Sequence, residues 1–174
     1  WEEMGYHPAK MAVNLSGYVI TDEDSLKQIC DVIDDLQIKE GELEIEVTET
    51  AVMLQLDQAK ESLEKLRETG ITIAMDDFGT GYSSLSYLKK FPIKYLKIDK
   101  SFLDDFNTKE GSTFVETIVK LGQTLNMKII AEWVEKLEQV EYLKKIKCDQ
   151  YQGYFCSKPL NAKDFEQFYL NKKI

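Results

Sequence analysis

The sequence has few of the residues that form disulfide frameworks and zinc sites. Its three cysteines, Cys30, Cys148 and Cys156, contain no CxxC pair, and their odd number gives no closed disulfide set. Its one histidine is His7, whereas zinc prefers histidine and cysteine ligands. We therefore expect reduced thiols, in a cytoplasmic protein or in the cytoplasmic part of a membrane-anchored protein.

Long apolar runs and positive charge are also scarce. No apolar run approaches the roughly 18 residues that a membrane-spanning helix needs. The formal net charge is −9, because 31 acidic residues outnumber 22 basic ones. This balance opposes binding to DNA or RNA duplexes, which attract clustered Lys and Arg. A ligand that carries phosphate would have to be attracted by something other than net charge.

The chain alternates β-rich runs with amphipathic helical patterns. Its 174 residues, 43% of them hydrophobic, suffice for one domain or a large piece of one. The expected strands are Met11–Ser16, Leu43–Thr48, Ile71–Asp77, Tyr95–Asp99, Lys128–Trp133 and Cys148–Gly153. Strand followed by helix, repeated, predicts an α/β fold with a parallel sheet.

Apolar residues recur at three- and four-residue steps between these strands, and this spacing predicts helices. Gly70 is placed to end one of them, and Asn161 to begin the last as its N-cap. A shorter helix is expected over Tyr82–Lys90, and Asn107–Ser112 reads as a polar surface loop.

Six β/α units fit two folds. A closed eight-stranded barrel takes about 250 residues, so a TIM-like barrel would be incomplete here, with its first two units before Trp1. An open doubly wound sheet fits the count, but such sheets usually carry a Gly-rich phosphate turn after the first strand. The segment Asn14-Leu15-Ser16-Gly17 is not such a turn. The pattern alone leaves both folds open.

A polar residue lies at or near the C-terminal end of every expected strand. These residues are Asn14, Glu46, Asp76, Lys97, Glu132 and Gln152. The alternation of side chains puts them on one common face, which in a barrel converges on the mouth where barrel enzymes build their sites. Taken alone, each of these residues is more simply interpreted as a loop anchor, a helix cap or a solvated charge. Six polar residues at matching positions of six successive strands predict a functional site.

The chemistry of this set suits divalent cations. Crowded carboxylates repel one another, and a cation removes that conflict. Carboxylate and amide oxygens favour Mg²⁺ or Mn²⁺. The adjacent Asp76 and Asp77 can share two ions, as in two-metal phosphoryl displacement. Lys97 would hold a phosphate oxygen or orient the attacking water.

Six segments together resemble, in order and spacing, the EAL phosphodiesterase domain family. The most specific is the ten-residue segment from Asp76 to Leu85. The others are Asn14-Leu15-Ser16, Glu46-Val47-Thr48-Glu49, Lys97-Ile98-Asp99, Ala131-Glu132-Trp133-Val134-Glu135, and Gln152-Gly153-Tyr154 with Ser157-Lys158-Pro159-Leu160. The resemblance implies a modified β/α barrel that hydrolyses cyclic di-GMP to linear pGpG with Mg²⁺ or Mn²⁺.

The resemblance also implies roles for single residues. It implies metal ligation by Asn14, Glu46, Asp76 and Asp77, with two metal ions. It further implies that Lys97 and Glu132 position and activate the hydrolytic water, and that Glu135 and the substrate-binding Gln152 line the same pocket. Glu49 resembles the residue that holds the Asp77–Leu85 loop in shape for metal and homodimer contacts.

Two departures from the family pattern bear on function. The Glu-Ala-Leu signature of the first strand is absent, so residues 1–174 are expected to be the C-terminal part of one EAL domain, inactive alone. A sensory or GGDEF-type domain upstream is compatible with the resemblance. Trp133 stands where the family has glycine, so we expect its indole to displace Glu132, to narrow the pocket, or to point outward among the helices.

Three hypotheses follow for the parent protein. The first is an active cyclic di-GMP phosphodiesterase, which the ordered polar set favours. The second is a catalytically silent cyclic di-GMP receptor, which Trp133 suggests. The third is a structural regulatory module that uses the Asp77–Leu85 loop as a dimer contact.

Overall fold

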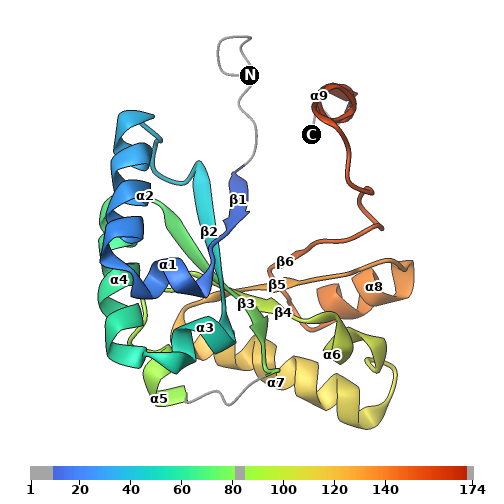
Figure 1. The fold of residues 1–174 in the computed structure, drawn as a ribbon. Coiled ribbons are helices and arrows are strands. Elements are labelled where there is room, and N and C mark those ends of the chain that lie inside the picture. Colours follow the sequence, from blue (N-terminus) through green and yellow to red (C-terminus); the bar gives the residue numbers. More distant parts are fainter. Residues whose placement is uncertain (1–9, 81–84, 172–174) are drawn as a thin grey trace.

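The computed structural model describes residues 10–80 and 85–171 (Figure 1). Within them a single sheet has six strands: β1 (Met11–Asn14), β2 (Leu43–Thr48), β3 (Thr72–Phe78), β4 (Tyr95–Ile98), β5 (Lys128–Ala131) and β6 (Gln150–Tyr151). All neighbouring strands are parallel, and their order in the sheet is their order in the chain. A doubly wound sheet would reverse this order at its switch point. The sheet is therefore a half-barrel, and the expected incomplete TIM-like barrel is confirmed.

The helices follow the strands as expected. They are α1 (Gly17–Thr21), α2 (Glu23–Asp35), α3 (Glu49–Leu54), α4 (Leu56–Glu68), α5 (Leu85–Leu88), α6 (Lys100–Asp104), α7 (Lys109–Leu125), α8 (Leu137–Lys145) and α9 (Ala162–Asn171). Gly70 has φ +89° just after α4, and Asn161 Oδ1 accepts a hydrogen bond from Asp164 N–H at 3.0 Å. None of the described helices has both the length and the apolar character needed to cross a bilayer.

Strands β1, β5 and β6 are shorter than expected, and one expected loop and one expected helix also differ from the structure. The polar loop expected over Asn107–Ser112 is wrong from Lys109 onward, where α7 begins. Thr108 caps this helix by accepting a hydrogen bond from Gly111 N–H at 3.0 Å, and an exposed first turn reads like a loop in sequence. Of the helix expected over Tyr82–Lys90, residues 82–84 lie outside the described residues, and α5 ends at Leu88.

The main core lies between the sheet and the helices on its outer face. Helices α2, α4, α7 and α8 lie along that face, and α9 lies apart from them beyond β6 (Figure 1). Aliphatic side chains such as Val47, Met75 and Ile98 on the strands pack with Leu63 on α4 and Val119 on α7, and all five are buried. The opposite set of strand positions therefore faces the inside of the half-barrel.

The inner face of the sheet is layered. A small apolar cluster of Ala74, Tyr95 and Ile130 lies at mid-height. Toward the strands' N-terminal ends, the Lys10 ammonium pairs with the buried Glu44 carboxylate and lies 3.8 Å from the centre of the Tyr95 ring. Strand β2 is buried on both faces. Its glutamates, Glu44 and Glu46, therefore need charged or hydrogen-bonding partners on the inner face of the sheet.

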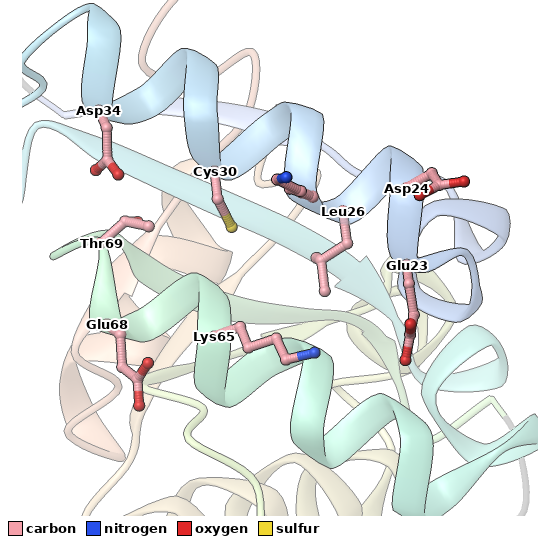
Figure 2. A pocket seen from close by; sticks show the side chains of 9 residues that line it. Glu23, Asp24, Leu26, Cys30, Asp34, Lys65, Glu68 and Thr69 are labelled. Carbon is pink, nitrogen blue, oxygen red and sulfur yellow. The ribbon is translucent and has the colours of Figure 1, made fainter.

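A groove on the helical side is separate from the inner face. It has a volume of about 500 Å³, and its lining comes from α2 and from the C-terminal end of α4. Figure 2 shows Cys30 and Lys65 between the two helices, with Asp34 and Glu68 near one end. The groove is lined by none of the strand-end polar residues, so it is distinct from the expected site.

Candidate active site

Four of the six strand-end residues meet at the mouth of the half-barrel. Lys97 on β4 is only 3% exposed, and its Nζ lies 2.8 Å from Glu46 Oε2 on β2 and 2.9 Å from Glu132 Oε1 after β5. It also lies 3.3 Å from Asp76 Oδ1 on β3. The side chains converge because parallel strands bring their carboxyl ends to one edge. The expected common face is confirmed for these four residues.

The two outer strands place their polar residues at the rim. Asn14 on β1 is exposed and is the register partner of Glu46. Gln152 follows β6 and is exposed, while its backbone N–H donates to Ala131 O at 2.8 Å. Among the described residues, the ion pairs of Lys97 involve only the three central carboxylates. Asn14 and Gln152 are thus near the site by register rather than by a contact with Lys97.

A bulge in β3 brings two adjacent aspartates to the mouth. Simple alternation would send Asp76 and Asp77 to opposite faces, but the register with β4 shifts between Met75 and Phe78. Asp77 adopts a left-handed backbone with φ +54°, which aspartate tolerates better than most residues. Each of Asp76, Asp77 and Glu132 offers one carboxylate oxygen, and these oxygens lie within 4.8 Å of one another. Bulges beside active sites re-aim side chains in this way.

The charges at the mouth are unbalanced. Burial alone would lower the pKa of Lys97, but hydrogen bonds to Glu46 and Glu132 raise it above its usual value, so Lys97 is a fixed cation. Burial raises the pKa of Glu132, and Lys97 opposes that change. Burial together with Asp76 and Asp99 also raises the pKa of Asp77. The carboxylates therefore carry more negative charge than one ammonium can offset, which favours a further cation.

The segment after β3 is tied to the end of β2. Glu49 is fully buried at the start of α3, and its Oε2 accepts a hydrogen bond from Gly79 N–H at 2.8 Å. Gly79 has φ +95°, and a Cβ there would lie 3.1 Å from the Phe102 ring. Glu49 thus contacts the segment after β3 at Gly79. Residues 81–84 of the expected Asp77–Leu85 dimer loop lie outside the described residues.

Trp133 occupies the position beside Glu132 without disturbing it. Its backbone is left-handed, with φ +56°, which explains why glycine suits this position. Such a conformation costs a bulky residue on the order of 1–3 kcal/mol. The indole is 49% exposed, and Glu132 keeps its contact with Lys97. The expected displacement of Glu132 is therefore not observed, and the ring is not buried among the helices.

One buried polar side chain outside the strands is missed by the sequence patterns. Gln139 on α8 is buried, and its Oε1 accepts hydrogen bonds from the backbone N–H groups of Glu135 and Lys136 at 2.8 and 2.9 Å. This contact fixes the backbone of Glu135, whose own side chain is exposed. The only signal in the sequence is a Gln at the third helical position, half of a capping box.

A family model for the EAL domain matches residues 1–159. The signaling protein YkoW of Bacillus subtilis is 42% identical over 99% of this chain and 22% of its own length. The cyclic di-GMP phosphodiesterase NbdA of Pseudomonas aeruginosa is 35% identical over 94% of this chain and 21% of its own. The chain thus spans about a fifth of the length of these curated relatives.

Solved structures show the same fold. The PaMucR phosphodiesterase in complex with c-di-GMP superposes with a TM-score of 0.88 at 36% identity, over 95% of this chain and 67% of that one. An EAL domain protein from Listeria monocytogenes gives a TM-score of 0.83 at 34% identity, over 93% of this chain and 65% of that one. With the half-barrel and its acidic mouth, these similarities lead to one conclusion: the chain belongs to the EAL domain family.

Proposed function

We propose that this chain is the C-terminal part of an EAL domain that hydrolyses cyclic di-GMP to linear pGpG. One observation carries the proposal: the Lys97 ammonium lies 2.8 to 3.3 Å from carboxylates on β2, on β3 and directly after β5. Relatives named as cyclic di-GMP phosphodiesterases support the choice of substrate.

The donor set fits magnesium or manganese. Oxygen atoms of Asp76, Asp77 and Glu132 lie within 4.8 Å of one another, and hard divalent cations prefer such oxygen ligands. We assign Asn14, Glu46, Asp76 and Asp77 as the residues that hold two ions, with Glu132 within reach of the same place. Bound cations neutralise the nonbridging phosphate oxygens and make water a better nucleophile.

The other residues of the chain act on the diester and on protons. Lys97 stays protonated, so it donates a hydrogen bond to a phosphate oxygen or to the attacking water and does not serve as a base. Glu132 accepts a proton from that water. Glu135 and Gln152 bind the dinucleotide at the rim of the mouth. Glu49 holds the loop after β3 through its hydrogen bond from Gly79 N–H.

The test uses the full-length parent protein with Mn²⁺ and cyclic di-GMP, and measures pGpG by chromatography. Glu132→Gln is expected to lower kcat by about 10²–10³-fold, because it removes the proton acceptor beside Lys97. Glu138→Gln, which removes the same charge from an exposed position on α8, should leave kcat unchanged. We expect residues 1–174 alone to be inactive.

Tight binding of cyclic di-GMP by the parent without turnover would instead identify a silent receptor. Failure to bind the nucleotide at all would leave a structural module. We further propose that the domain works in the cytoplasm and dimerises through the Asp77–Leu85 segment. Sedimentation of the parent with and without cyclic di-GMP tests the dimer.

A further inference from the structure

An exposed indole lies at the mouth of the half-barrel. Trp133 directly follows Glu132, one of the carboxylates that contact Lys97 at the mouth. Glu132 is buried, whereas half of the Trp133 side chain is open to solvent. A large, partly exposed aromatic side chain therefore directly follows one of the three carboxylates that contact Lys97.

The backbone holds this ring in place on both sides. Glu132 N–H donates to Ile98 O at 3.2 Å, and Val134 N–H donates to Gln152 O at 3.0 Å. Gly153 packs so closely here that a Cβ on it would lie 2.3 Å from Val134 backbone atoms. Trp133 is thus fixed between segments that extend β4 and β6, in a left-handed conformation that a bulky residue seldom adopts. Such strain persists where the surroundings enforce it, most often at functional sites.

A cation lies beside the ring. The ammonium of Lys100, an exposed residue at the start of α6, is 5.7 Å from the centre of the Trp133 ring. Surface pairs of this kind also form in proteins without any ligand. Here the pair lies next to the acidic mouth of a chain whose net charge is −9, where a local cation favours an anionic ligand.

We propose that Trp133 and Lys100 form a base-binding subsite that stacks one guanine of a cyclic dinucleotide while its phosphate lies at Lys97. The subsite rests on the proposed function and adds to it a determinant of substrate affinity. Every base presents a π face that stacks on an aromatic side chain. Lys100 faces the negatively charged part of the same ligand.

The experiment compares variants of the full-length protein in Mn²⁺. Trp133→Gly removes the ring and relieves the left-handed backbone, so it is expected to fold. We expect its KM for cyclic di-GMP to rise about tenfold, the effect of losing one stacked base, with kcat within threefold of the parent. Trp133→Phe keeps an aromatic face and should restore most of the affinity. Lys100→Gln should raise KM by about threefold.

Two further measurements separate stacking from a structural role. Mn²⁺ affinity without nucleotide, measured by calorimetry, should be equal in the parent and in Trp133→Gly. Cyclic di-GMP should quench part of the tryptophan emission of the parent, and that part should be missing in Trp133→Phe.

The outcomes distinguish this proposal from the proposed function. Turnover by the parent with an unchanged KM in Trp133→Gly would overturn the subsite and leave the function standing. Equal losses of kcat and Mn²⁺ affinity in Trp133→Gly would also overturn it, because the ring would then act through the metal site. A parent that binds Mn²⁺ but no cyclic di-GMP would overturn both.

Discussion

The inner face of the half-barrel has a paired lysine at each end, and the two lysines differ in their partners. At the N-terminal end of the strands, Lys10 pairs with one carboxylate, that of Glu44, and lies against Tyr95. At the C-terminal end, Lys97 lies among three carboxylates, with Asp77 beside them. The first pair is electrically balanced, whereas the second group has an excess of negative charge.

This difference in charge distinguishes a structural ion pair, at Lys10, from a candidate cation-binding site, at Lys97. A balanced buried pair satisfies the charges that the strands bring inside, and it needs nothing more. An unbalanced cluster is stable only with a raised carboxylate pKa or with an added cation. The shifted pKa values of Glu132 and Asp77 lie at the C-terminal end. Divalent ions should therefore bind and stabilise the C-terminal end of the inner face, at Lys97, and not the N-terminal end, at Lys10.

The largest effect is expected from Lys97→Met. In the parent protein it should lower kcat by about 10²–10³-fold, because the substrate phosphate loses a charged donor. Without divalent ions it should also lower the free energy of unfolding by about 3–5 kcal/mol, since two buried carboxylates and the half-buried Asp76 lose their cation. Millimolar Mn²⁺ should restore much of that stability, as thermal denaturation would show. A loss of stability that Mn²⁺ leaves unchanged would contradict an ion site here.

Lys10→Met is the matching change at the other end. It leaves the Glu44 carboxylate buried without its ammonium, so the free energy of unfolding should fall by about 2–3 kcal/mol. The loss is smaller because Lys10 is itself partly exposed. Mn²⁺ should not recover this loss in the same thermal denaturation series. Recovery equal to that of Lys97→Met would break the comparison between the two ends.

Glu49→Gln tests the buried carboxylate at the start of α3 that accepts a hydrogen bond from the backbone of Gly79. The amide side chain is nearly isosteric but is a weaker acceptor for Gly79 N–H. Because this contact supports the segment that follows Asp77, we expect Mn²⁺ affinity to fall about 10-fold or more, with little change in fold. Calorimetric Mn²⁺ titration measures this. Glu61→Gln, an exposed change of the same charge on α4, is the control and should have no effect.

The last prediction involves no change in activity or stability and concerns two cysteines on either side of β6. Burial raises the pKa of Cys148 to about 11, above the usual value of 9.0, whereas Cys156 is exposed in the loop after β6. At pH 8 the thiolate fraction of Cys148 should be about 100-fold below that of an ordinary thiol. Iodoacetamide labelling followed by mass spectrometry should modify Cys156 well before Cys148. Equal labelling rates would show that the N-terminal end of β6 opens readily.

The sequence predicts the strands and the mouth because both follow a simple period. Alternation in β2 and β4 placed Glu46 and Lys97 on one face, and the structure brings them together. The bulge in β3 has no such period, so alternation alone could not place Asp76 and Asp77 at the same mouth. The sequence also did not predict the contact between Lys10 and Glu44, because Lys10 lies outside the expected strands, where alternation gives no information.

The strand order has a consequence for how this chain folds. Each strand pairs only with the strands next to it in sequence, so every pairing closes a loop of one or two helices and their turns. The entropic cost of closing a loop rises with its length, so pairing of neighbouring strands costs less than pairing of strands far apart in the sequence would. During folding the sheet can therefore form from any pair of neighbouring strands and then extend by one strand and its connecting helices at a time. Insertions between units should then slow a single closure step without altering the others.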